Sequence, residues 1–96
     1  MEIIWIAKAT QDLNNHIAYI SEQSPQNALT VLNAILNLSK TLGDMPYKYP
    51  KEPIYNQENI RFVSKWSFKI IYRIAENKIY ILGVFSTYQH PEKLRR

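Results

Sequence analysis

Apolar and polar residues alternate most regularly between residues 68 and 74 of this chain. Because side chains of a strand point alternately to its two faces, this pattern predicts a strand with one apolar face and one face that carries cations. The apolar positions are Phe68, Ile70, Tyr72 and Ile74, and the cations are Lys69 and Arg73. Such a surface suits a small domain that contacts a polyanion or an acidic partner.

Two earlier stretches follow a helical period instead. Apolar residues recur every three or four positions from Ala9 to Ile20, and again from Ala28 to Leu42. Ser24 and Pro25 are a start signal for the second helix, since Ser accepts hydrogen bonds from free N–H groups and Pro needs none at the first helical position. Gly43 is a natural residue to follow that helix. The pattern predicts a helical hairpin with a wide apolar face.

The remaining strands are expected near residues 2–6, 59–64 and 78–86, with residues 76–77 as a tight turn and residues 44–58 as an ordered loop. The strand at 78–86 is almost entirely apolar and should be central. The order β-α-α-β-β-β predicts an α+β fold in which a short N-terminal strand and a helical hairpin pack with a small antiparallel sheet. At 96 residues, we expect a single domain spanning 1–96.

Composition narrows the cellular setting. The chain has no Cys, so no disulfide framework, and no apolar run near the length of a membrane span. Its first residues lack the features of a signal peptide. We therefore expect a cytoplasmic protein with no membrane partner.

Charge is divided unevenly along the chain. Residues 1–58 hold four Lys or Arg and six acids, whereas residues 59–96 hold eight Lys or Arg and two acids. A basic second half favours nucleic acid or an acidic protein segment as a partner, and a merely solubilising surface is the alternative. The candidate contacts are Arg61, Lys65, Arg73, Lys93, Arg95 and Arg96.

Candidate chemistry is sparse. His16 and His90 have no neighbours at metal-ligand spacing, and two glycines cannot form a phosphate loop, so we expect neither a metal nor a cofactor. Metal-free RNA cleavage needs cations on the phosphate and groups that move protons. Lys69 could supply the charge, with Tyr88 and His90 for the protons; equally, these residues could be ordinary surface groups. Tyr72 is expected to pack in the core, and the role of Trp66 stays open.

The succession of these segments resembles the RelE/ParE family of toxins from type II toxin–antitoxin modules. The resemblance rests on Asp12-Leu13, Ser24-Pro25, Pro46, Ile60-Arg61, the run from Phe68 to Ile74 and the run from Ile79 to Phe85. It implies a small bacterial protein that arrests growth and is held inactive, as a hetero-oligomer, by a cognate antitoxin.

The resemblance implies two activities. RelE-like members cleave mRNA on the ribosome without metal, whereas ParE-like members inhibit DNA gyrase. In the nucleases an Arg stands where this chain has Lys69, which lacks the bidentate fork of Arg. A His or Arg follows their last strand, where this chain has Thr87, Tyr88 and Gln89.

These departures, together with the Ser24-Pro25 start, favour gyrase inhibition. An mRNA endonuclease, with Lys69, Tyr88 and His90 as its catalytic set, is the alternative, and an inactive module that only binds antitoxin is a third hypothesis. The antitoxin is expected to lay an acidic, amphipathic segment near Trp5, Leu29, Leu32 and Leu36.

Overall fold

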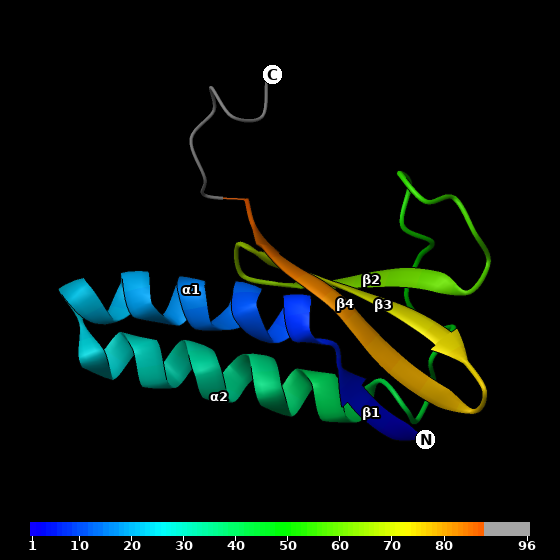
Figure 1. Ribbon diagram of the computed structural model, residues 1–96, viewed down its shortest axis with the longest axis horizontal. Coiled ribbons are helices and arrows are strands. Elements are labelled where there is room, and N and C mark those ends of the chain that lie inside the picture. The colour runs from blue at the N-terminus through cyan, green and yellow to red at the C-terminus, as the bar shows by residue number, and fades with distance from the viewer. Residues whose placement is uncertain (88–96) are drawn as a thin grey trace.

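The computed structural model describes residues 1–87 and contains two helices and four strands (Figure 1). In chain order these are β1 (Glu2–Trp5), α1 (Ala7–Gln23), α2 (Pro25–Thr41), β2 (Ile60–Lys65), β3 (Phe68–Ala75) and β4 (Lys78–Ser86). This is the β-α-α-β-β-β order of an α+β fold that the hydrophobic pattern predicts.

The four strands form one sheet in the order β1-β4-β3-β2. β4 is therefore central, as its apolar composition predicts. β2, β3 and β4 are antiparallel neighbours, but β1 runs parallel to β4, with Glu2 opposite Lys78 and Trp5 opposite Ile81. The expected small antiparallel sheet is formed by β2, β3 and β4, and β1 extends it as a parallel edge strand, which makes the whole sheet mixed. The helical hairpin separates β1 from the other strands, which allows β1 to pair with β4 in the same direction.

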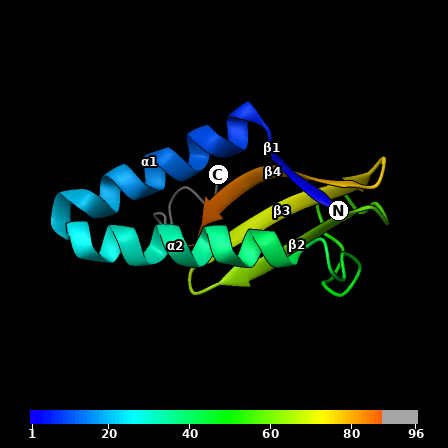
Figure 2. The same ribbon diagram turned by 90° about the horizontal axis from the view of Figure 1, so that it is seen from below.

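The helical hairpin covers one face of the sheet (Figures 1 and 2). The start of α2 is as predicted: the Ser24 Oγ accepts a hydrogen bond from the Asn27 N–H at 3.1 Å, and Pro25 is the first helical residue. Gly43 serves a different purpose from the expected one. Its φ is not positive, and an added Cβ would lie 3.0 Å from the Met1 backbone oxygen. Gly43 therefore allows the N-terminus to approach the end of α2.

The core lies between the helices and the facing side of the sheet. Ile70, Tyr72, Ile79 and Ile81 are fully buried there, together with Ile35 from α2. The tyrosine packs as expected, and its Oη donates to the Pro46 carbonyl at 2.6 Å. Burial raises the pKa of Tyr72 to about 12.

Two local features of the β3–β4 hairpin set its register. Glu76 and Asn77 have φ values of 56° and 59°, which gives the tight turn expected between these strands. Farther along, Ile71 pairs with Gly83 but Tyr72 pairs with Ile81, so Leu82 is an extra residue in β4. This bulge places Ile79, Ile81 and Val84 on the buried face, although Ile81 and Val84 differ in parity.

The loop 44–58 lies along the free edge of β2. The Pro50 carbonyl accepts from Phe62 N at 3.1 Å, and Glu52 N donates to the Ile60 carbonyl at 2.9 Å. Lys51 forms a bridge with Arg61. The loop thereby satisfies part of an edge that would otherwise be open to pairing with other chains.

Candidate functional site

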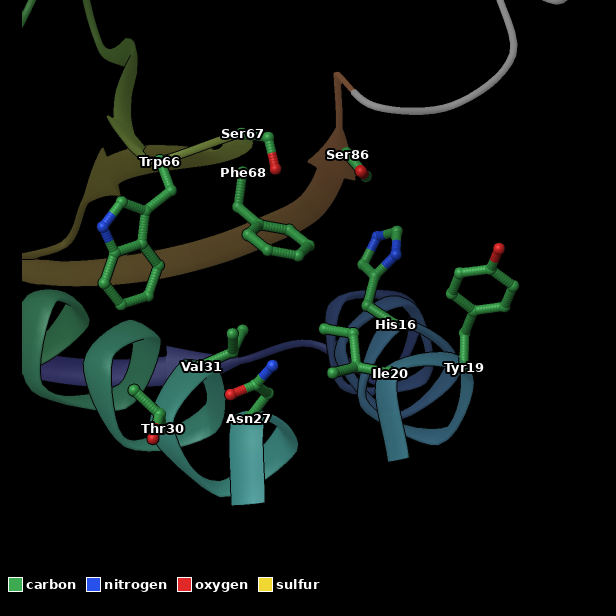
Figure 3. Close-up of a pocket in the computed structure, with 10 residues that line it drawn as sticks. All are labelled: His16, Tyr19, Ile20, Asn27, Thr30, Val31, Trp66, Ser67, Phe68 and Ser86. Carbon is green, nitrogen blue, oxygen red and sulfur yellow. The ribbon is translucent and has the colours of Figure 1, made fainter. Parts of the chain in front are cut away.

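An apolar cleft opens between the tip of the helical hairpin and the turn that joins β2 to β3 (Figure 3). It has a volume of about 420 Å³. Its lining comes from α1, α2, the β2–β3 turn and the end of β4: His16, Tyr19, Ile20, Asn27, Thr30, Val31, Trp66, Ser67, Phe68 and Ser86. The sequence did not predict this cleft, because its lining residues are separated by long stretches of chain.

Two large aromatic side chains at the cleft are exposed to solvent. Tyr19 is 67% exposed and Trp66 is 59% exposed. Trp66 sits at a backbone φ of 54° in the turn after β2, and the Lys65 ammonium lies 4.7 Å from the centre of its ring. Exposed aromatic groups beside an apolar hollow are the usual composition of a protein-binding surface.

His16 and Asp12 attach α1 to β4 just past the point where β1 ends. The Asp12 Oδ2 accepts from the Val84 N–H at 3.1 Å, and His16 Nε2 lies 2.9 Å from the Val84 carbonyl oxygen. A carbonyl only accepts, so the proton is on Nε2. Asp12 and His16, one helical turn apart, thus bind the Val84 backbone groups at a place where no strand within residues 1–87 pairs with that side of β4. The sequence analysis did not predict this contact of His16 with β4.

Lys69, the predicted catalytic cation, is paired with an acid that the sequence analysis did not single out. Its Nζ lies 2.8 Å from Oε1 of Glu52, whose side chain is fully buried. The ammonium also lies 4.4 Å from the Phe62 ring centre. The other carboxylate oxygen of Glu52 accepts from Ile54 N at 2.7 Å and Tyr55 N at 3.1 Å.

These contacts set the charge state of Glu52. Burial alone would raise the pKa of the Glu52 carboxyl. The hydrogen bonds from Lys69 and from the two backbone N–H groups, together with the charge of Lys69, lower this pKa by more than burial raises it. The net result is a pKa below the usual carboxyl value, so Glu52 is ionised at neutral pH and Lys69 neutralises it.

The three predicted contact cations within residues 1–87, Arg61, Lys65 and Arg73, are not gathered into one patch. Arg61 is buried and its guanidinium contacts Glu58 and the Tyr47 and Tyr49 carbonyls. Arg73 lies over the Tyr80 ring at 4.8 Å, opposite Ile60, whereas Lys65 is at the other end of β2. Ile60 and Lys65 are five positions apart along β2, which is roughly 17 Å.

The predicted antitoxin residues occupy a different part of the surface from the cleft. Leu29 is 55% exposed on α2, whereas Leu32 and Leu36 are partly buried against the core. These three share one flank of α2 by their helical spacing, and Asn27 and Val31 share another. Trp5 is partly buried on the edge strand. The candidate residues Tyr88, His90, Lys93, Arg95 and Arg96 lie outside the described residues.

Comparison with known proteins identifies the family. A family model for the ParE toxin of the type II toxin–antitoxin system parDE matches residues 3–91. This chain belongs to the ParE toxin family. A solved chain from the chromosomal ParDE toxin–antitoxin system of P. aeruginosa superposes with a TM-score of 0.72 at 24% identity, over 90% of this chain and 95% of that one. That likeness shows the ParE-like fold. No curated protein matches the sequence.

For this ParE-family chain, two further findings apply to residues 1–87. No group of three His, Cys, Asp or Glu side chains lies where it could hold a metal ion, and neither helix is long and apolar enough to cross a membrane. The sequence analysis missed Glu52 and Asp12 because their roles depend on partners distant in sequence. The one sequence signal for a distinct role of Glu52 is that it is the single acidic residue among the prolines and tyrosines of residues 46–55.

Proposed function

We propose that this ParE-family chain arrests bacterial growth by inhibiting DNA gyrase in the cytoplasm, and that a cognate antitoxin neutralises it by direct binding. The ion pair of Lys69 with the buried Glu52 is the observation that supports this choice. A nuclease would need the ammonium of Lys69 for the scissile phosphate. Here that ammonium already neutralises an internal carboxylate and holds the loop 44–58.

The dispersal of the other predicted contact cations within residues 1–87 supports the same choice. Cleaving a phosphodiester requires several charges that converge on one phosphate. Arg61 is engaged with the protein itself. Arg73, on β3, faces Ile60 at one end of β2, whereas Lys65 lies at the other end of β2. Inhibition of a protein target needs no such convergence, because it depends on complementary surfaces.

The cleft is the surface that best fits the antitoxin. Its apolar lining could receive the apolar side of an amphipathic segment, with Tyr19 and Trp66 closing over it. Lys65 at its edge would attract acidic residues of the same segment and raise the association rate. The flank of Leu29, Leu32 and Leu36 with Trp5 is the second proposed surface, and the two are distinguished by substitution below.

The decisive experiment combines two assays: supercoiling by gyrase in the presence of the purified chain, and primer extension on a reporter mRNA from cells in which the chain has been induced. We expect loss of supercoiling and intact transcripts. A double variant, Glu52→Gln with Lys69→Gln, removes the cation but keeps a hydrogen-bonded pair at the same place. We expect it to inhibit gyrase like the wild type. Cuts within codons that vanish in this variant would instead establish the nuclease, and a chain inactive in both assays would be an antitoxin-binding module.

A further inference from the structure

The turn 52–56, at the opposite end of β2 from the cleft, carries the most exposed large apolar side chain in the described part of the chain. Ile54 is 88% exposed, and its neighbour Tyr55 is 48% exposed. Because the Ile54 side chain is almost fully exposed, it contributes no hydrophobic burial to the stability of the fold. Its presence on a surface is therefore informative only if the surrounding structure holds it in place.

The structure does hold it in place. Five hydrogen bonds fix the turn around Glu52: its carboxylate accepts from Ile54 N, Tyr55 N and Lys69 Nζ, its own N–H donates to Ile60, and its carbonyl accepts from Asn56 N at 2.8 Å. Asn56 adopts a φ of 52°, in the left-handed region. The side chains of Ile54 and Tyr55 thus project from a backbone that these hydrogen bonds hold in place.

The charge that fixes this turn is costly to bury. A fully buried carboxylate paired with one ammonium stabilises a fold no better than an apolar pair of similar volume would. What the Glu52–Lys69 pair does provide is a fixed orientation for Ile54 and Tyr55. A contact surface that is rigid before binding loses less conformational entropy on association.

We infer that Ile54 and Tyr55 form the contact by which the toxin binds its protein target. The partner that fits is a protein with an apolar pocket for these two side chains and acidic groups at its rim, because the exposed Lys51 stands beside the turn while the acid within it, Glu52, is buried and neutralised. The position of the turn agrees with this role. It projects on the side of the molecule away from the hairpin tip (Figures 1 and 2), and the cleft lies at that tip, so one surface serves the target and another the antitoxin. This inference rests on the proposed function.

The test replaces both side chains, Ile54→Ser with Tyr55→Ser, without altering the backbone groups that bind Glu52. The matched control is Met45→Ser, which removes a 64% exposed apolar side chain from the same loop outside the turn. Thermal unfolding shows whether each variant is folded. We expect the double variant to need at least about tenfold more protein for half-inhibition of gyrase, and to lose growth arrest, while Met45→Ser behaves like the wild type.

The outcomes separate this inference from the proposed target. If the wild type inhibits gyrase and the double variant inhibits it equally, the contact assignment is wrong and the function stands. If the wild type arrests growth without affecting gyrase, the target is wrong, and loss of growth arrest in the double variant alone still supports the contact. Equal growth arrest by all three proteins overturns the contact in either case, and a wild type without any effect overturns both.

Discussion

A buried carboxylate determines what Lys69 does in this protein. Glu52 is fully buried, and its nearest cation is the Lys69 ammonium at 2.8 Å. An ionised group in such a place must be compensated, because removing one partner leaves the other desolvated and unpaired. The same side chain that the sequence suggests for catalysis is thus required by the fold.

Replacing this lysine should therefore affect stability before it affects any reaction. We expect Lys69→Ala to lower the free energy of unfolding by about 3 kcal/mol, since the Glu52 carboxylate loses its counter-charge. Urea denaturation at pH 7 measures this loss. The neutral pair Glu52→Gln with Lys69→Gln should lie within about 1 kcal/mol of the wild type, because no charge is then buried alone. A Lys69→Ala protein as stable as the wild type would contradict the pairing.

Acid should reveal the same interaction. The folded protein holds the pKa of Glu52 below its value in the unfolded chain, so the stability that this group contributes is complete above the ordinary carboxyl pKa. That stability is lost as the pH falls through the lower, folded pKa. We expect urea midpoints measured from pH 7 downwards to fall more steeply in wild type than in the neutral Gln pair. Parallel curves for the two proteins would argue against a lowered pKa.

At the scale of elements, α1 completes the sheet as well as covering it. Asp12 and His16 occupy successive turns and bind the N–H and the carbonyl of Val84, at a place where β1 no longer reaches. The bulge at Leu82 brings Val84 to the buried face at this point. The registration of helix against sheet is therefore set by two specific polar contacts in addition to apolar packing.

Removing one of these contacts should loosen a defined part of β4. We expect Asp12→Ala to lower the free energy of unfolding by about 1–2 kcal/mol, because the Val84 N–H loses its acceptor. Hydrogen exchange followed by NMR should show faster exchange at Val84 than in wild type. The amide of Ile74, bound to the Asn59 carbonyl at 2.8 Å, serves as the internal control and should change less. Equal acceleration at both amides would indicate general destabilisation instead.

The elements were largely predictable from the sequence, and the contacts between them were not. Helical and alternating periods reflect burial along one element, so α2 and the central strand β4 follow directly from the positions of their apolar residues. The Ser24 cap is equally local. The parallel pairing of β1 with β4 and the acceptor role of Asp12 depend on residues some 70 positions apart. The cleft depends on where the hairpin tip lies against the β2–β3 turn. No local pattern encodes any of these.

The whole molecule presents separate surfaces at its two ends. The cleft lies between the hairpin tip and the β2–β3 turn, and the turn 52–56 lies at the other end of β2, where Glu52 N donates to the Ile60 carbonyl. Between them, β3 carries Lys69 and Arg73, which contact Glu52 and the Tyr80 ring respectively. The proposed function requires at least two partners, a target and an antitoxin, and distant surfaces allow each to be altered alone.

Antitoxin binding distinguishes the two candidate surfaces on α2. If the cleft is the site, Trp66→Asn should weaken binding at least about tenfold, because Trp66 and Tyr19 are its two large exposed aromatic side chains. Asn tolerates the left-handed backbone at this position. Growth arrest should persist, and co-expressed antitoxin should no longer relieve it. Leu29→Ser, on the other flank, should then bind normally. The reverse result, with Leu29→Ser weakened and Trp66→Asn unchanged, would place the antitoxin on the Leu29, Leu32 and Leu36 flank.

Lys65→Glu adds a kinetic measurement at the cleft: association of the antitoxin should slow, and its dependence on salt should flatten, since rim charges act mainly on the encounter rate.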